Sequence, residues 1–143
     1  MTRTFNDNWA VRMVSTPATH AANAHYGEWI DMLGFRRCAF IMLAGELDAD
    51  MAAVVYQATD DSGSDAQVLD TTLADSFING TDESRVAIAE VRDADLDDGF
   101  RYVTVLVTPG NTDGYACVAV LGEPYEAPVG NLPADGVAFN IGE

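Results

Sequence analysis

The amino-acid sequence predicts a mainly β fold, an antiparallel β-sandwich or barrel-like single domain with extended N- and C-terminal arms. Three observations lead to this class. Residues 100–107 alternate between two faces, residues 35–43 form a short and almost continuous apolar run, and clusters of Gly, Pro, Asn and Asp separate such segments. The length of 143 residues suits one domain, and a hydrophobic content of 48% is enough for a buried core.

The first 33 residues are expected to form an N-terminal arm that includes, at most, a short helix. Residues 15–17, Ser-Thr-Pro, would cap such a helix, and the apolar residues of 26–33 have helical spacing, although a glycine interrupts them. Residues 11–13 alternate between apolar and polar, which weakly favours a strand. The sequence of residues 1–33 is therefore compatible with both a short helix and an extended arm.

Residues 34–121 are expected to form the β core. Its first strand is bounded by glycines and is typical of a central strand covered on both faces. Its last two strands flank the turn cluster 109–114 and predict a hairpin. Residues 69–77 fit a short helix and an irregular strand about equally well. The strands expected in this core are residues 35–43, 51–59, 85–91, 100–107 and 115–121.

Residues 122–143 are expected to form a C-terminal arm. Three prolines and four glycines lie in this stretch, and each proline fixes the backbone and removes a hydrogen-bond donor. An extended segment with spaced apolar side chains cannot bury them in itself, so the composition favours contact with another surface. The hypothetical interface anchors in the two arms are Phe5, Trp9, Tyr125, Leu132 and Phe139.

The charge balance excludes several classes of function. The chain has 23 acidic and seven basic residues, all seven of them arginines, for a formal charge of −16. Such a chain lacks the clustered cations that nucleic acids and anionic membrane surfaces require. Its longest apolar run is far shorter than the ~20 residues that span a bilayer, and its first residues contain no apolar signal core. We therefore expect no nucleic-acid partner, no membrane partner and no standard export signal.

The cysteines and histidines match no metal or catalytic signature. Cys38 and Cys117 lie in apolar stretches, which indicates buried, reduced thiols that burial keeps unreactive. His20 and His25 are five residues apart, a spacing that would separate their rings on a helix. Even together with the two cysteines, their spacing corresponds to no common zinc site. We therefore expect neither a metal nor a cofactor.

The acidic segment 93–99 invites comparison with a calcium-binding EF-hand loop. That loop requires glycine at its sixth position and a bidentate glutamate at its twelfth, whereas Asp98 and Thr104 stand at these positions here. The segment is therefore expected to be a solvated turn with Leu96 directed inward. The chain also lacks hydrolase, phosphate-loop and dinucleotide fingerprints, so we expect no enzymatic activity and no catalytic residues.

Four segments share β-strand patterning within about residues 26–129, and they are Trp29–Arg36, Val55–Asp60, Leu96–Val103 and Val120–Tyr125. In this pattern the chain resembles small virion structural proteins of tailed bacteriophages. The resemblance implies a β-sandwich or barrel-like capsid cement or decoration protein, made in the host cytoplasm, that binds the major capsid protein on the outer surface of the virion. It also implies a homo-oligomer, a trimer or larger ring.

The sequence is also compatible with two other functions. A host-adhesion or carbohydrate-binding β-sandwich would use exposed aromatic side chains, with Trp29 or Tyr115 stacking on sugar rings. A head–tail or tail component of the virion would instead assemble as a closed ring. A small hydrolase ranks last, because nothing in the sequence matches a catalytic motif.

Overall fold

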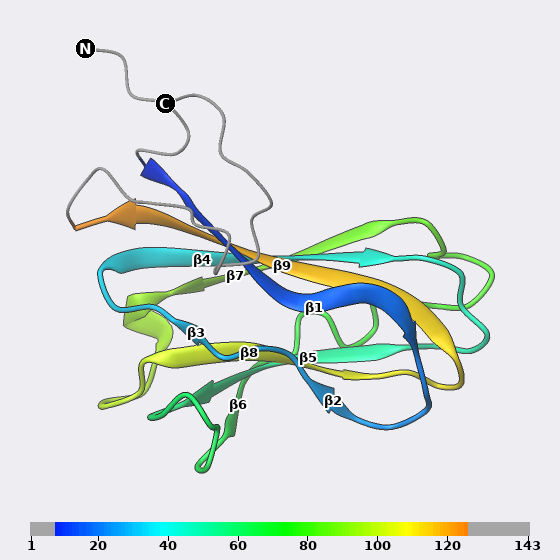
Figure 1. Ribbon diagram of the computed structural model, residues 1–143, viewed down its shortest axis with the longest axis horizontal. Helices are drawn as coiled ribbons and strands as arrows, with labels where there is room; N and C mark the ends of the chain where they lie inside the picture. The colour runs from blue at the N-terminus through cyan, green and yellow to red at the C-terminus, as the bar shows by residue number, and fades with distance from the viewer. Residues whose placement is uncertain (1–7, 126–143) are drawn as a thin grey trace.

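Two antiparallel sheets packed face to face confirm the expected β-sandwich (Figure 1). The structure is a computed structural model, and it describes residues 8–125. Sheet A has the order β1-β9-β4-β7, and its strands are β1 (Ala10–His20), β9 (Asp113–Pro124), β4 (Phe35–Ala44) and β7 (Val86–Arg92). Sheet B has the order β2-β8-β5-β6, with β3 also paired to β8, and its strands are β2 (His25–Tyr26), β3 (Ile30–Asp31), β5 (Ala52–Ala58), β6 (Gln67–Asp70) and β8 (Tyr102–Thr108).

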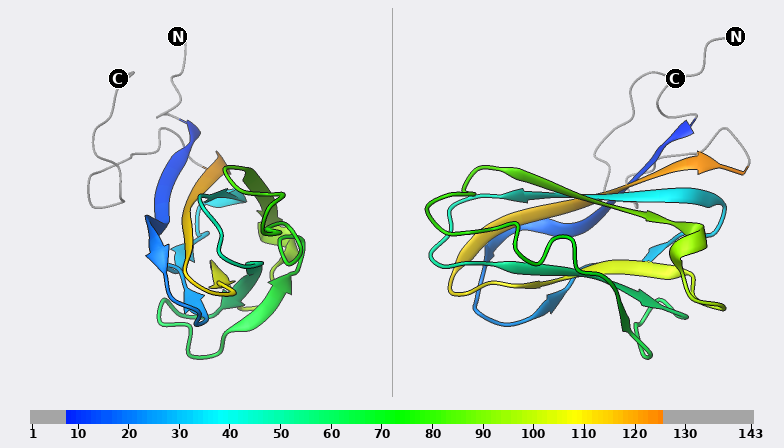
Figure 2. Two further views of the ribbon diagram at one scale, coloured as in Figure 1. Left: turned by 90° about the vertical axis from the view of Figure 1, so that its right-hand side faces the viewer. Right: turned by 180° about the vertical axis from the view of Figure 1, so that it is seen from behind.

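Successive strands of the chain repeatedly change sheet. β4 of sheet A is followed by β5 of sheet B, and β7 of sheet A is followed by the 3₁₀ turn η1 (Asp93–Asp95) and then by β8 of sheet B. β5 and β6, in contrast, are consecutive strands that pair directly. Figure 2 shows the result from the end, where the strands of both sheets surround a common interior.

Alternation directs every second side chain of a strand into this interior. Phe40 and Met42 of β4 are fully buried in one core cluster with Val103 and Val105 of β8. β4 lies between β9 and β7, which confirms that the apolar run forms a central strand. The expectation that both faces of this strand are covered is wrong, because Leu43 is 43% exposed. The run is continuous because the outward residues of β4 are also largely apolar.

The N-terminal segment belongs to the sandwich. β1 pairs with β9 along its length, and β2 and β3 pair with β8. The expected arm over residues 1–33, with its optional helix, is therefore wrong from residue 10 onward. β1 is an edge strand whose pairing is irregular between Ser15 and Ala18, and this irregularity accommodates Pro17, which has no backbone donor to offer the sheet.

The expected hairpin between the last two strands is also wrong. β8 belongs to sheet B and β9 to sheet A, so residues 109–112 cross from one sheet to the other. Asp113 organises this crossing. Its buried carboxylate accepts hydrogen bonds from the backbone N–H groups of Asp48, Ala49 and Gly110 at 2.7, 3.3 and 3.0 Å.

Two further boundaries differ from expectation. β9 continues to Pro124, so the expected arm over residues 122–143 begins within a strand. The stretch 69–77 forms no helix: it starts in β6 and continues as turns. Leu73 and Phe77 of these turns are buried, each 1% exposed, and they close the core beside β5.

Candidate protein-interaction surface

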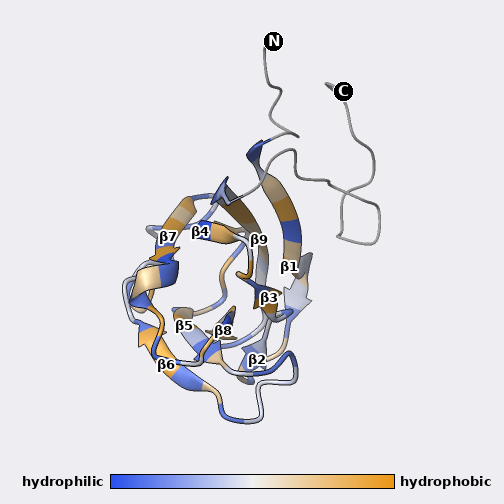
Figure 3. Cartoon of the chain, turned by 90° about the vertical axis from the view of Figure 1, so that its left-hand side faces the viewer, coloured by the Kyte–Doolittle hydropathy of each residue, from blue (hydrophilic) through white to orange (hydrophobic). Residues whose placement is uncertain are grey.

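Apolar side chains cover the outer face of sheet A, where one row crosses all four strands. Met13 of β1 lies beside Val118 of β9, which lies beside Ile41 of β4. Ile41 in turn pairs with Ile88 of β7. Figure 3 shows that the strands of this sheet contain hydrophobic stretches. We call this set the apolar sheet face, and its residues are Val11, Met13, Ala39, Ile41, Leu43, Val86, Ile88, Val118 and Val120.

Several side chains of the apolar sheet face are open to solvent. Leu43, Val86 and Ile88 are 43%, 56% and 60% exposed, and the other members are half-buried. None of the nine is ionisable. The largest apolar patch on a soluble monomer covers about 300–600 Å² and often serves a function. This face therefore has the composition of a protein contact.

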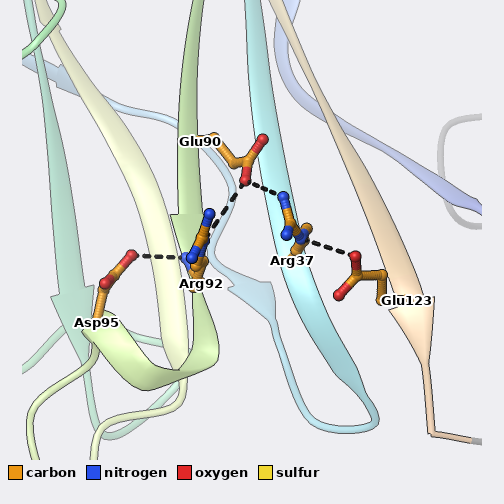
Figure 4. Close-up of polar contacts among 5 residues, drawn as sticks. All are labelled: Arg37, Glu90, Arg92, Asp95 and Glu123. Carbon is orange, nitrogen blue, oxygen red and sulfur yellow. Dashed lines mark hydrogen bonds and ion pairs between the residues drawn. The ribbon is translucent and has the colours of Figure 1, made fainter.

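A charge cluster closes one end of the apolar sheet face. Arg37 donates from Nη1 to Glu90 Oε1 at 2.7 Å, and its Nε lies 2.9 Å from Glu123 Oε1 (Figure 4). Arg92 Nε lies 3.8 Å from the same oxygen of Glu90. The hydrogen bond and charge of Glu123, followed by the charge of Glu90, raise the pKa of Arg37. The charges of the two arginines and the two glutamates cancel, and the carboxylate of Asp95 accepts a hydrogen bond from the backbone N–H of Arg92.

Two expected anchors pack on the sandwich close to that end. Trp9 is 39% exposed and its ring covers Gly122, where an added Cβ would lie 2.1 Å from the ring carbon Cζ3. Tyr125 is 55% exposed, and its hydroxyl donates to the Asp93 carboxylate. The guanidinium of Arg36 lies 4.8 Å from the centroid of the Tyr125 ring. The remaining expected anchors, which lie outside the described residues, are Phe5, Leu132 and Phe139.

The apolar sheet face has a signal in the sequence, but local patterning does not reveal that it faces outward. Val86 and Ile88 fall on one face of an alternating segment, and the run 35–43 has apolar residues at every outward position except one arginine. An apolar residue in an alternating strand is usually assigned to the core, and the outward direction of these residues becomes evident only from the pairing of β4 with β7 and β9.

The two cysteines lie in the core, and the two histidines flank the turn between β1 and β2. Cys38 and Cys117 are free and buried, as expected, and burial raises the pKa of Cys117 to about 12. The rings of His20 and His25 have centroids only 5.5 Å apart across the turn from β1 to β2, so the expectation that they lie apart, which assumed a helix, is wrong. Tyr115 is 4% exposed and stacks on His20 at 4.1 Å, which removes it as a sugar contact.

Carboxylates of the acidic turns accept hydrogen bonds from neighbouring protein groups. Asp60 accepts hydrogen bonds from serines of its loop, and these bonds, that of the Ser64 hydroxyl foremost, hold the pKa of Asp60 below its ordinary value. Asp97 exchanges two hydrogen bonds with the buried amide of Gln57, at 2.7 and 2.9 Å. Leu96 packs against the core, as expected. Across residues 8–125, no group of three or more His, Cys, Asp or Glu side chains is placed to hold a metal ion.

Comparisons with known proteins give one distant likeness. No family model and no curated protein matches the chain. A solved structure described as "Bacillus endospore appendages form a novel family of disulfide-linked pili" is 15% identical with a TM-score of 0.46, and the match covers 87% of this chain and 97% of that chain. In the part of the chain that the structure describes, no helix has the length and apolar character to cross a membrane.

Proposed function

We propose that this chain is a structural protein that docks onto a larger protein shell through the apolar sheet face, as a capsid cement or decoration protein does. The observation that supports this most is the apolar row across all four strands of sheet A in a chain of charge −16. That charge keeps most of the surface hydrated and repels other copies. A neutral apolar face is where a protein partner can approach at the lowest electrostatic cost.

The size of the face fits the centre of a protein interface. Strands about 4.8 Å apart, with same-face residues about 7 Å apart along each strand, give the nine residues a footprint of about 300 Å². A stable interface removes about 800 Å² from each partner. The apolar sheet face would supply the centre of that contact, and Trp9 and the charge cluster would supply part of its polar and aromatic rim.

The proposed partner is the major capsid protein of a tailed bacteriophage, which the resemblance in β-strand patterning suggests. Full burial of a large apolar side chain contributes about 1.5–3 kcal/mol, and association itself costs several kcal/mol. One copy would therefore bind with modest affinity. Many copies on one shell would add their contributions and hold neighbouring capsomers together.

The substitution Ile88→Asp tests this proposal. Ile88 is 60% exposed, so the sandwich tolerates the change, whereas a carboxylate on the β7 side of a docked apolar face would be buried without a partner. We expect shell occupancy, measured by co-sedimentation with purified capsids, to fall by at least about tenfold. The matched control is Leu33→Asp, which places the same charge at a 67% exposed apolar residue in the turn before β4 and should keep wild-type occupancy. Equal occupancy for Ile88→Asp and wild type would contradict the docking face.

A further inference from the structure

Three aromatic rings gather on the outer face of sheet B, opposite the apolar sheet face. The Tyr26 ring meets Tyr56 edge-on at 5.4 Å between centroids and lies 5.7 Å from Trp29. Tyr56 of β5 pairs with Thr104 of β8, a fully buried residue whose hydroxyl donates to the carbonyl of Glu28 at 2.8 Å. This hydrogen bond fixes the segment between β2 and β3, which contains Trp29, to sheet B.

One of these rings is open to solvent, and the other two, Trp29 and Tyr56, are half-buried. Tyr26 is 51% exposed, and Val68 of β6, which pairs with Tyr56, is 52% exposed. Gly63 packs against the indole of Trp29, since an added Cβ there would lie 2.4 Å from the ring carbon Cζ2. We call Tyr26, Trp29, Tyr56 and Val68 the aromatic patch.

Carboxylates lie next to the aromatic patch on the side of the loop that contains Gly63. Glu28 is exposed beside Trp29, and Asp61 is exposed in the loop whose Gly63 covers that indole. Arg101, directly before β8, is bound by Asp31 in a two-point contact of 2.8 and 2.6 Å, and Arg12 lies beside Glu28 and Trp29. The negative side of the patch is therefore the loop 60–65, which contains three aspartates and no basic residue.

We infer that the aromatic patch binds an arginine-rich segment of a partner protein. A guanidinium is weakly hydrated and planar, so it stacks on aromatic rings while nearby carboxylates neutralise it. The chain forms this contact twice within itself, with Arg36 4.8 Å from the Tyr125 ring centroid and Arg101 5.1 Å from that of Tyr102. A second copy is a poor occupant, because it brings a charge of −16 to the acidic loop 60–65. The inference does not depend on the proposed function, since the two surfaces lie on opposite sheets.

Calorimetry with a ten-residue peptide of alternating Arg and Gly tests the inference, using the full chain at low salt. We expect this peptide to bind more tightly than its Lys-Gly counterpart, and a Glu-Gly peptide to show no binding. Tyr26→Leu should weaken the Arg-Gly peptide about two- to five-fold, because it removes one ring face from an exposed cation–π contact. Tyr26→Phe, which keeps the ring, should retain wild-type affinity.

Tyr125→Leu is the control, because Tyr125 is equally exposed but lies outside the aromatic patch, and it should bind the peptide as wild type does. An unchanged affinity in Tyr26→Leu would show general attraction to an acidic protein and would overturn the inference. Binding on a glycan array that Tyr26→Leu abolishes, without peptide binding, would overturn it in favour of a carbohydrate site. Because no shell is present, a failure here says nothing against the docking of sheet A.

Discussion

Asp113 ties together two connections at one end of the sandwich. Its carboxylate is fully buried and accepts three backbone hydrogen bonds, two from the connection between β4 and β5 and one from the connection between β8 and β9. Cysteine burial could be predicted because apolar neighbours in the sequence decide it. The role of Asp113 could not, because two of its partners, Asp48 and Ala49, lie more than sixty residues away.

The substitution Asp113→Ala should lower the free energy of unfolding by about 1–3 kcal/mol, since it leaves three partly buried N–H groups without their acceptor. Urea denaturation measures this loss. Asp61→Ala removes an exposed carboxylate and should change the stability by less than about 0.5 kcal/mol. If both variants unfold at the same urea concentration, Asp113 does not hold the crossing together.

The hydrogen bonds to Asp60 predict that the free energy of unfolding falls at acidic pH. Hydrogen bonds from Ser64 and its neighbours hold the pKa of Asp60 below the value of about 3.9 that it has in an unfolded chain. The ionised form is therefore favoured in the folded state, and its stabilisation is complete above the unfolded pKa and disappears as the pH falls toward the folded one. Asp60→Ala should lose less stability than wild type between about pH 5 and pH 2 in thermal unfolding. Parallel curves for the two proteins over this range would refute the role of Asp60.

The positions of most strands could be predicted from the sequence, but their pairing could not. The runs at 35–43, 51–59, 85–91 and 100–107 all appear as strands, because alternation and turn residues are local properties. A turn cluster between two strands is equally compatible with a hairpin and with a crossing between sheets. The connection between β8 and β9 is a crossing. The N-terminal strand was obscured by Pro17, which an edge strand tolerates at an irregularity.

The contact between Trp9 and Gly122 joins the segment before β1 to β9, and a double-mutant cycle tests it. Gly122→Ala should destabilise the protein by about 1–3 kcal/mol, because the new Cβ would overlap the indole. In the background of Trp9→Ala, the same change should cost far less, since the ring is absent. Urea unfolding of the four proteins gives the coupling free energy. Additive effects would mean that the ring does not occupy this position in solution.

At the scale of the whole molecule, charge and apolar surface are segregated. The acidic residues lie mainly in the turns, where many accept hydrogen bonds from their own loops, while the apolar sheet face contains no charge and ends in a balanced cluster. The overall charge of −16 was evident from the sequence, but this segregation was not, because it depends on which side of each strand faces outward. The two sheets thus present two different outer surfaces, one apolar and one aromatic beside an acidic loop.

Electron cryomicroscopy of the capsid decorated with this chain would reveal its orientation. If the chain is a cement protein, the density should place the outer face of sheet A against the shell, with Ile41 and Ile88 at the contact and sheet B directed outward. A map in which sheet A faces solvent, or in which the chain does not occupy the shell at all, would contradict docking through the apolar sheet face.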